Sequence, residues 1–321
     1  MIELNFKIFA TIKDFSIARE LLNAGVTAFR VNSSHMEIGE LIEFLEEYQF
    51  HFYNIPLYID LKGSKKRLRK DQRTVELIPG EKIVFATSES PEIKTLLVEP
   101  AVLKLLSPNL NVSLNDGKIK LKILDNDGNR AYAIVLKAGR VHGAKGINFE
   151  FLSDKNFRSF SLTEKDVEII SKTRDYPFVR YALSFVSSPE QIKNLRAISR
   201  RYVAAKIENY LDLDKLKEIS SETDEMWFCR GDLGAHLGMR GLAKFYGEFV
   251  KSMRDFTCPV FMAGEVMEHM VDNPRPTRSE ICHLYDLIEH GFSGIVLSNE
   301  TVSGNFPIEV VKVVREVISG D

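Results

Sequence analysis

The chain has 321 residues, 44% hydrophobic and 27% charged, a composition typical of a globular protein with one large and one smaller domain. The net charge of −2 argues against a nucleic-acid surface. No apolar run approaches about 18 residues and no basic and apolar leader opens the chain, so we expect neither membrane insertion nor secretion. Its three cysteines share no metal-binding spacing and suit a reducing cytoplasm.

Strand-like and helix-like segments alternate from the first residues. Apolar runs predict strands over 7–12, 27–32 and 56–61, and amphipathic patterns predict helices over 14–23 and 37–48. From Gly63 to about Leu152 the helical periodicity disappears, and short β-type runs are separated by hairpin signals at 115–117 and 125–129. We therefore expect a β lid domain over 63–152, inserted into a larger domain made of 1–62 and 153–321.

The alternation resumes with Ser161-Leu162-Thr163-Glu164, which has the pattern of a capping box before a helix that ends near Thr173. Strands are expected over 178–185, 202–207, 225–229, 259–263 and 294–298, and helices over 189–199, 211–220, 241–254, 279–290 and 307–318. Repeated βα units in this number favour a closed (β/α)8 TIM barrel of the α/β class, with the small β domain inserted after strand 3. An open doubly wound sheet is the alternative, but no G-x-G-x-x-G follows the first strand.

Charged side chains follow two neighbouring strands at the points where these strands end. Lys206 and Glu208 end the fifth strand, and Arg230-Gly231-Asp232 follows the sixth. Because adjacent parallel strands end at the same edge, we expect Glu208 and Asp232 to share one space and to hold a hard divalent cation such as Mg²⁺. Lys206 would stand beside them as a point charge for a phosphate or carboxylate. Solvated loop ends also carry such residues, and only the pairing on consecutive strands favours a site.

The other strand ends are polar as well, and each also has a structural interpretation. Asn32 and Ser34 after the second strand are able to cap a helix, and Arg30 is able to pair with Asp60 of the third. The histidines show no zinc-ligand spacing. A barrel would nevertheless bring all these groups together, which favours a site over separate structural roles.

Seven motifs follow one another along the chain. They are Arg30-Val31-Asn32-Ser33-Ser34-His35, Asp60 with Lys62-Gly63, Lys145-Gly146-Ile147-Asn148, Lys206-Ile207-Glu208-Asn209, Arg230-Gly231-Asp232-Leu233-Gly234, Asn273-Pro274-Arg275-Pro276-Thr277-Arg278 and Ser298-Asn299-Glu300-Thr301. In this order they resemble the pyruvate kinase family over nearly the whole chain. The resemblance implies a (β/α)8 barrel with a β domain inserted after strand 3, as the alternation suggests independently. Members usually carry a further C-terminal domain for effectors and tetramer contacts, and we expect that domain to be missing here, with a homo-oligomer still possible.

The resemblance implies a cytoplasmic phosphotransferase of glycolysis that uses Mg²⁺ or Mn²⁺ to move a phosphoryl group between phosphoenolpyruvate and ADP. Its small-molecule partners would be phosphoenolpyruvate, pyruvate or another 2-oxo acid, and a nucleotide. By position, the resemblance assigns the metal to Glu208 and Asp232, catalysis to Lys206, Arg30 and Ser298, the substrate carboxylate to Gly231, Asp232 and Gly264, and the nucleotide phosphates to Arg30, His35, Arg67 and Lys145.

Two departures from the family pattern concern the site. Most members bind a monovalent cation near Asn32, Ser34 and Asp60, whereas this chain has Leu61 and Lys65 where they have a threonine and a glutamate. That pair resembles the branch that does not require K⁺, because a lysine supplies the charge. We therefore expect activity without K⁺.

The second departure is at the end of the seventh strand, where members read Ala-Thr-Gln-Met and this chain reads Ala263-Gly264-Glu265-Val266. The missing hydroxyl belongs to the group that protonates the enolate, and Ser303 also replaces a nucleotide-binding lysine. An alternative is therefore a diverged barrel enzyme that carries out enolate or 2-oxo-acid chemistry on another substrate, by modified phosphotransfer, decarboxylation or aldol-type cleavage. A non-catalytic ligand-binding homologue is a third interpretation, disfavoured by the intact Lys206, Glu208 and Asp232.

Overall fold

The computed structural model describes residues 6–63, 65–115, 117–149 and 162–319, and it does not describe the side chain of His35. Over these ranges the chain forms two compact units. The barrel unit comprises Met1–Ser64, Phe160–Arg230 and Tyr246–Asp321, and the β unit comprises Lys65–Ser159 and Gly231–Phe245. The domain boundary expected at residues 152 and 153 lies outside the described residues.

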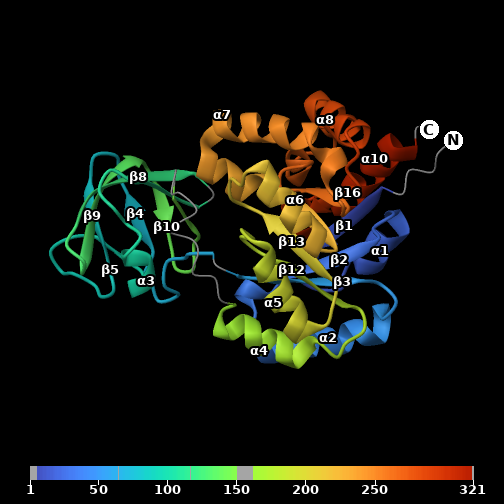
Figure 1. Cartoon of the computed structure of the whole chain (residues 1–321), viewed down its shortest axis with the longest axis horizontal. Helices are drawn as coiled ribbons and strands as arrows, with labels where there is room; N and C mark the ends of the chain where they lie inside the picture. Colours follow the sequence, from blue (N-terminus) through green and yellow to red (C-terminus); the bar gives the residue numbers. More distant parts are fainter. Residues whose placement is uncertain (1–5, 64, 116, 150–161, 320–321) are drawn as a thin grey trace. The chain divides into compact units, whose positions relative to one another are not determined.

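Eight parallel strands of the described ranges close into a barrel, which confirms the expected (β/α)8 fold (Figure 1). Each strand pairs with the next along the wall, and the last pairs with the first through Gly294 and Lys7. Nearly all their residues are buried, since parallel strands are covered on both faces. The strands are β1 (Lys7–Thr11), β2 (Ala28–Asn32), β3 (Leu57–Leu61), β12 (Val179–Leu183), β13 (Val203–Ile207), β14 (Glu225–Cys229), β15 (Val260–Ala263) and β16 (Gly294–Leu297).

Helices lie around the outside of these strands (Figure 1). The N-cap of α8 is Thr277, whose hydroxyl accepts the Glu280 N–H at 3.2 Å while the Glu280 carboxylate accepts the Thr277 N–H at 2.8 Å. Within the described chain, no helix has the length and apolar character needed to cross a bilayer. The barrel helices are α1 (Ala18–Ala24), α2 (Ile38–Phe52), α4 (Glu164–Thr173), α5 (Pro189–Ser199), α6 (Leu213–Glu222), α8 (Arg278–Glu289), α9 (Asn299–Val302) and α10 (Pro307–Ser319), with short 3-10 turns at Ser33–His35, Met253–Asp255 and Glu268–Val271.

Helix α4 begins later than the capping box over 161–164 predicts. Its N-cap is Thr163, and the carboxylate of Asp166 accepts the Thr163 N–H at 3.0 Å. Ser161, the expected cap, lies outside the described residues. Asp166 also accepts the N–H groups of Lys62 at 3.0 Å and Gly63 at 3.2 Å. The same carboxylate therefore caps α4 and holds the chain where it leaves β3.

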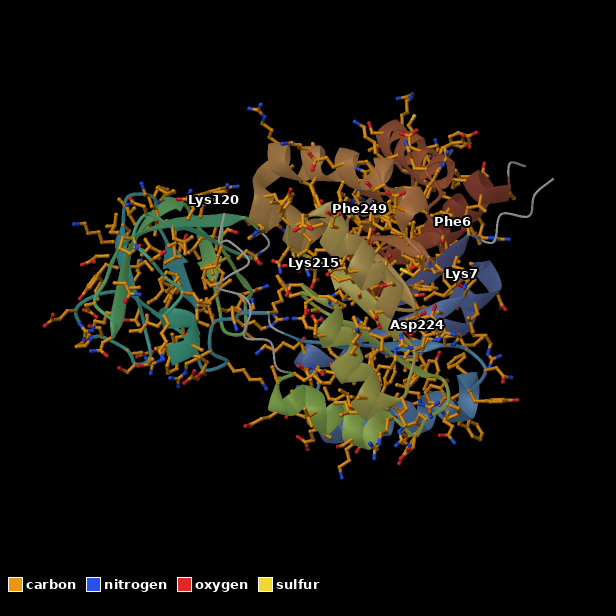
Figure 2. All side chains as sticks on the ribbon, viewed as in Figure 1. Phe6, Lys7, Lys120, Lys215, Asp224 and Phe249 are labelled. Carbon is orange, nitrogen blue, oxygen red and sulfur yellow. The ribbon has the colours of Figure 1, made fainter. Side chains whose placement is uncertain are left out.

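The predicted helix over 241–254 is wrong at its start, because α7 (Arg230–Lys251) begins at Arg230. The chain is helical from Arg230 onward and bends at Gly238, where φ is 68°. Glycine adopts such a φ without steric cost. Near the end of α7, Phe249 is buried against Phe228 of β14, with ring centroids 4.6 Å apart (Figure 2).

An aromatic layer fills the barrel interior. Phe9 lies 5.0 Å from Tyr58 and 4.6 Å from Phe261 between ring centroids, and Trp227 lies 5.2 Å from Tyr58. The buried carboxylate of Glu225, the first residue of β14, accepts the Trp227 indole N–H at 2.8 Å. Burial raises the pKa of Glu225. This apolar filling leaves the carboxyl ends of the strands as the place where polar side chains gather.

The β unit is built mainly from antiparallel strands, and its one described parallel pair is β5 with β6. Both predicted hairpins are confirmed: β7 pairs with β8 across residues 115–117, and β8 pairs with β9 across residues 127–129. The described strands form a six-stranded sheet in the order β11-β7-β8-β9-β5-β6 and a two-stranded sheet of β10 and β4. These elements are β4 (Val75–Leu77), β5 (Lys82–Ala86), β6 (Thr95–Leu97), α3 (Pro100–Leu103), β7 (Asn111–Leu114), β8 (Ile119–Asn126), β9 (Arg130–Lys137), β10 (Gly139–Val141) and β11 (Ile147–Phe149).

We predict that Gly63→Ala lowers the free energy of unfolding by about 2 kcal/mol or more. Gly63 has a φ of 55°, and a Cβ there would lie 2.3 Å from the Ser184 carbonyl oxygen. Gly39→Ala in α2 is the matched control: its Cβ meets nothing within 4 Å, so it should raise stability by about 0.5 kcal/mol. Urea unfolding followed by circular dichroism measures both, and a Gly63→Ala variant as stable as the parent would contradict the tight turn.

Candidate active site

Lys206 occupies the centre of a buried polar cluster at the carboxyl end of β13. Only 7% of it is exposed, and its Nζ lies 3.0 and 3.1 Å from the two carboxylate oxygens of Asp60. The same Nζ is 3.0 Å from Glu208 Oε1 and 3.0 Å from Ser184 Oγ. Lys206 is two residues beyond Ala204, which belongs to the packed barrel interior, so strand alternation turns its side chain inward.

Arg30 of β2 brings a second cation to the cluster. Its Nε donates to Asp60 Oδ2 at 3.1 Å, and its Nη2 donates to the same oxygen. Its Nη1 donates to Thr11 Oγ1 at 3.1 Å and to Ser298 Oγ at 3.2 Å. One guanidinium thereby joins the carboxyl ends of four barrel strands.

The charged groups of this cluster stabilise one another in their ionised forms. Burial alone would raise the pKa of Asp60, but Lys206 and Arg30 outweigh burial and hold that pKa far below its ordinary value. Burial alone would lower the pKa of Lys206, yet Asp60 and then Glu208 raise it. Asp60 likewise raises the pKa of Arg30 against the effect of burial. The carboxylate therefore stays ionised and both cations stay protonated near neutral pH.

Glu208 is the predicted metal ligand that lies in this cluster. It is 3% exposed, and its Oε2 accepts the Phe185 N–H at 2.8 Å. An ionised carboxylate has about four lone-pair positions, so a carboxylate that already accepts such contacts is able to ligate a hard cation as well. The described side chains include no group of three or more His, Cys, Asp and Glu arranged as a metal site. This donor chemistry fits a cation such as Mg²⁺, which takes only one or two protein carboxylates.

At the ends of β15 and β16, the side chains of Glu300 and Arg230 form hydrogen bonds with main-chain groups. The buried carboxylate of Glu300 accepts the Ser298 N–H at 2.8 Å and the Met267 N–H at 3.1 Å. Gly264, at the end of β15, has a φ of 82°, and its carbonyl accepts the Arg230 Nε–H at 2.9 Å. These contacts fix the turns on which two predicted site residues, Ser298 and Gly264, stand.

Five of the predicted site residues belong to the β unit: Lys65, Arg67, Lys145, Gly231 and Asp232. The ammonium of Lys65 lies 2.8 Å from both carboxylate oxygens of Asp232, and the two side chains form a half-buried ion pair. Arg67 donates from Nη1 to the Ala144 carbonyl at 2.9 Å, and the Leu68 N–H reaches the Lys145 carbonyl at 2.9 Å. The strand-like segment after Lys65 is thus held beside the segment that carries Lys145.

The turn after β2 contains Asn32, Ser34 and His35, and Gly231 lies in the first turn of α7. The side-chain oxygen of Asn32 accepts the Ser34 N–H at 3.1 Å, which is the capping role expected as the structural alternative. The intervening Ser33 donates its hydroxyl to the Asp60 carbonyl at 2.7 Å. The side chain of His35 lies outside the described atoms. This turn is therefore tied to the cluster through the main chain of β3.

Thr11 and Ser184 belong to the cluster, but the sequence reasoning missed them. Thr11 accepts from Arg30 and donates to the Leu297 carbonyl at 2.7 Å, while Ser184 donates to Asp60 at 3.2 Å and contacts Lys206. Each is the polar residue at or just after the end of its strand. The pattern that located the other site residues is a polar side chain at the end of a strand. The same pattern, applied to β1 and β12, would have found Thr11 and Ser184.

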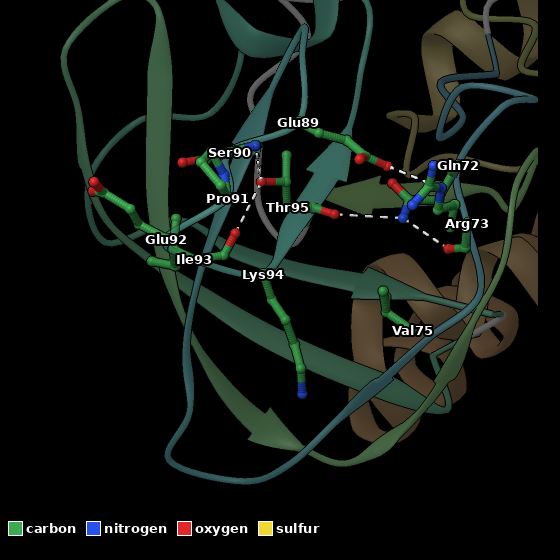
Figure 3. Close-up of a pocket in the computed structure, with 10 residues that line it drawn as sticks. All are labelled: Gln72, Arg73, Val75, Glu89, Ser90, Pro91, Glu92, Ile93, Lys94 and Thr95. Atoms are coloured by element: carbon green, nitrogen blue, oxygen red, sulfur yellow. Dashed lines mark hydrogen bonds and ion pairs between the residues drawn. The ribbon is translucent and has the colours of Figure 1, made fainter.

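A surface hollow of about 320 Å³ lies in the β unit between residues 72–75 and 89–95 (Figure 3). Gln72 donates to the carbonyls of Arg73 at 2.8 Å and Thr95 at 3.4 Å, and it accepts the Leu97 N–H. The buried polar groups at the floor thus bond to one another, and the charged residues at the rim are of both signs. None of the predicted site residues is among the described residues that line it.

Comparisons with known proteins give the family that this chain resembles. The family model "Pyruvate kinase, barrel domain" matches residues 7–311. The pyruvate kinase of Borreliella burgdorferi is 26% identical, over 97% of this chain and 67% of its own length. That of Methanocaldococcus jannaschii is 28% identical, over 91% of this chain and 64% of its own length. The chain thus spans about two thirds of these relatives.

A solved structure shows the same fold. The crystal structure of pyruvate kinase from Pyrobaculum aerophilum superposes with a TM-score of 0.82 at 23% sequence identity. The match covers 99% of this chain and 74% of that one. At this identity the likeness establishes the fold and leaves the chemistry to be argued from the residues themselves.

We predict that Asp60→Asn lowers the free energy of unfolding by about 3–5 kcal/mol at pH 7, because it leaves two buried cations without the carboxylate between them. The pKa of Asp60 is lowered by folding, so its contribution is present above its ordinary pKa of 3.8 and is lost as the pH falls below that value. The difference between variant and parent should therefore shrink by about 1 kcal/mol at pH 3. Urea unfolding at the two pH values measures this change.

The control is Asp71→Asn, which removes the carboxylate of an exposed pair with Arg69. It should leave stability unchanged, because such surface pairs contribute little. A difference for Asp60→Asn that stays constant from pH 7 to pH 3 would contradict an ionised, cation-bound Asp60.

Proposed function

The chain belongs to the pyruvate kinase family, and from that premise we propose that it transfers a phosphoryl group between phosphoenolpyruvate and ADP. The required cation is Mg²⁺ or Mn²⁺, K⁺ is not required, and the reaction serves glycolysis in the cytoplasm. The observation that carries the proposal is the buried ammonium of Lys206, held between Asp60 and Glu208 at the carboxyl ends of the strands. Catalytic groups of (β/α)8 barrels stand at that end.

In this proposal Glu208 and Asp232 hold the divalent cation. When bound, the cation supplies positive charge to the oxygens of the phosphoryl group and of the substrate. Glu208 is fixed for this role by the Phe185 N–H on one oxygen and by Lys206 on the other. Asp232, whose carboxylate accepts from Lys65 at 2.8 Å, would be the second residue to hold the cation.

Lys206 and Arg30 provide the fixed positive charge of the site. Phosphoryl transfer spreads negative charge over the equatorial oxygens, and charges placed in advance lower the barrier without reorganisation. Asp60 keeps both cations protonated and sets the direction of each side chain. Ser298 receives the Arg30 Nη1–H and so fixes the guanidinium against β16.

The substrate carboxylate binds to main-chain groups. The N–H groups of Gly231 and Asp232 lie in the first turn of α7, whose N-cap, Cys229, makes no side-chain capping bond. A helix N-terminus of this kind favours an anion. Gly264 supplies the backbone at the end of β15. The nucleotide phosphates are assigned to four residues, namely Arg30, His35, Arg67 and Lys145.

Lys65 explains the proposed independence from K⁺. Its ammonium is a permanent monovalent charge, carried 2.8 Å from the carboxylate of Asp232. The remaining residues assigned to the monovalent site, Asn32, Ser34 and Asp60, lie at the ends of β2 and β3. A tethered cation of this kind takes the place of an exchangeable one.

A second candidate is enolate or 2-oxo-acid chemistry on another substrate, and the backbone at Gly264 favours it. With a φ of 82°, this position disfavours the β-branched threonine that the family pattern has there. The chain therefore lacks the threonine hydroxyl that would help to protonate the enolate, and the backbone conformation of this turn disfavours a threonine. The metal and phosphate part of the site is unaffected by this difference.

We predict turnover of phosphoenolpyruvate and ADP with Mg²⁺ in buffer free of K⁺, followed by coupling to lactate dehydrogenase. Lys206→Met should lower kcat about a hundredfold to a thousandfold, because it removes a charge placed for the transition state. Lys215→Met is the control, since this lysine of α6 pairs with Glu218 on the surface, away from the cluster (Figure 2). Turnover that appears only with K⁺ would refute the K⁺ independence, and no turnover in either buffer would refute the phosphotransfer.

For the second candidate we predict that oxalate or oxaloacetate with Mg²⁺ raises the unfolding temperature, because a ligand of the folded state stabilises it by mass action. Glu208→Gln should abolish that increase. Glu218→Gln, at an exposed carboxylate, should retain it. A stabilisation that survives Glu208→Gln would show that the ligand binds without the proposed cation.

A further inference from the structure

The turn at the end of β15 has an unusual backbone. Gly264 and Glu265 both have positive φ, of 82° and 53°. Glycine adopts this region freely, but a glutamate there is strained and persists only when its surroundings hold it. The strained turn lies at the carboxyl end of a barrel strand and includes a proposed substrate-binding residue, so neighbouring side chains must hold it in place.

Arg230, the first residue of α7, binds the strained turn. Its Nε donates to the Gly264 carbonyl at 2.9 Å and its Nη2 donates to the Glu265 carbonyl at 2.6 Å. One planar guanidinium thus binds two successive carbonyls, which sets their relative direction. Release of either carbonyl would let the turn return to negative φ.

His283 of α8 holds the guanidinium. Its Nε2 lies 2.8 Å from Arg230 Nη1, and because a guanidinium has only donors, the imidazole accepts through Nε2 and carries its proton on Nδ1. The Tyr246 ring of α7 packs against the imidazole, with centroids 5.8 Å apart. His283 is therefore fixed on one side by an aromatic ring and on the other by the arginine.

The charge state of His283 agrees with this role. Burial, followed by the neighbouring Arg230, lowers the pKa of His283 to about 4, against an opposing effect of Asp286 and a small supporting one of His290. The imidazole is therefore neutral at physiological pH and able to accept. A protonated imidazole would repel Arg230.

We propose that His283 is a positioning residue that acts through Arg230 to keep the Gly264–Glu265 turn in the conformation that binds the substrate carboxylate. The inference rests on the proposed function for the identity of the ligand, and on the described contacts for the turn itself. His283 touches no reacting atom in this scheme. It sets the fraction of molecules whose turn is ready to bind, and a ligand's apparent affinity falls in proportion to that fraction.

His283→Leu removes the acceptor and should release the turn. We expect hydrogen–deuterium exchange of the 264–267 amides to become about tenfold faster, the dissociation constant of oxalate with Mg²⁺ and the KM for phosphoenolpyruvate to rise about tenfold, and kcat to change less than about twofold. His283→Gln, which retains an acceptor near the Nε2 position, should restore the parent values. His290→Leu removes an exposed imidazole from the end of the same helix and should change none of them.

Glu265→Gly keeps the test decisive if His283→Leu folds poorly. Glycine adopts the left-handed backbone without strain, so in this background the turn no longer depends on the clamp and His283→Leu should have little further effect. Glu265→Gln, which removes the charge but keeps the strain, should leave the full effect of His283→Leu.

The proposal is overturned if His283→Leu exchanges and binds like the parent, if His283→Gln behaves like His283→Leu, or if the effects of His283→Leu and Glu265→Gly simply add. Exchange at 264–267 is measured without any ligand. A parent protein that neither binds oxalate nor turns over phosphoenolpyruvate therefore refutes the proposed function, while the exchange data still decide whether His283 maintains the turn.

Discussion

The candidate site depends on a buried charge balance between Lys206, Arg30, Asp60 and Glu208. Removing each of these ions from water costs several kcal/mol, and each is stable in the interior only because the others are there. The balance in turn depends on strand register: Asn32 of β2 stands opposite Asp60 of β3, and a slip of one residue would turn each side chain to the other face of the wall. The chemistry of the site is therefore a consequence of how the barrel strands are paired.

The aromatic interior makes that pairing rigid. Rings from Phe9, Tyr58, Trp227 and Phe261 fill the space beneath the charged cluster, so the strands cannot shift without opening a cavity. The buried carboxylate of Glu225 is retained there because an indole N–H satisfies it. Apolar packing at one level of the barrel and ionic pairing at the next thus act together to hold the site before any ligand arrives, and such advance positioning is what electrostatic catalysis requires.

The sequence alone was sufficient for the barrel and for the charged cluster, since buried parallel strands are apolar runs and the polar residues at their ends can be read directly. It was not sufficient where local signals conflict. A helix was expected only from residue 241, yet residues 230–240 already form the first turns of α7, because tertiary packing overrides a weak propensity. Thr11 and Ser184 are uncharged residues at strand ends, where the same signal applies, and their contacts with Arg30 and Lys206 identify them as members of the cluster.

The two parts of the site also differ in what determines them. The charged cluster is determined by side-chain identity, so the presence of Lys206 or Glu208 at a strand end in the sequence already indicates a charged site. The turn at the end of β15 is determined by backbone conformation, and a glycine in a sequence does not reveal its φ. The positive φ of Gly264, and the Arg230 side chain that binds its carbonyl, are seen only in the structure. Replacing Gly264 with threonine would therefore not simply restore a hydroxyl. It would place a β-branched side chain on left-handed backbone, so such a variant would report on the turn as much as on proton transfer.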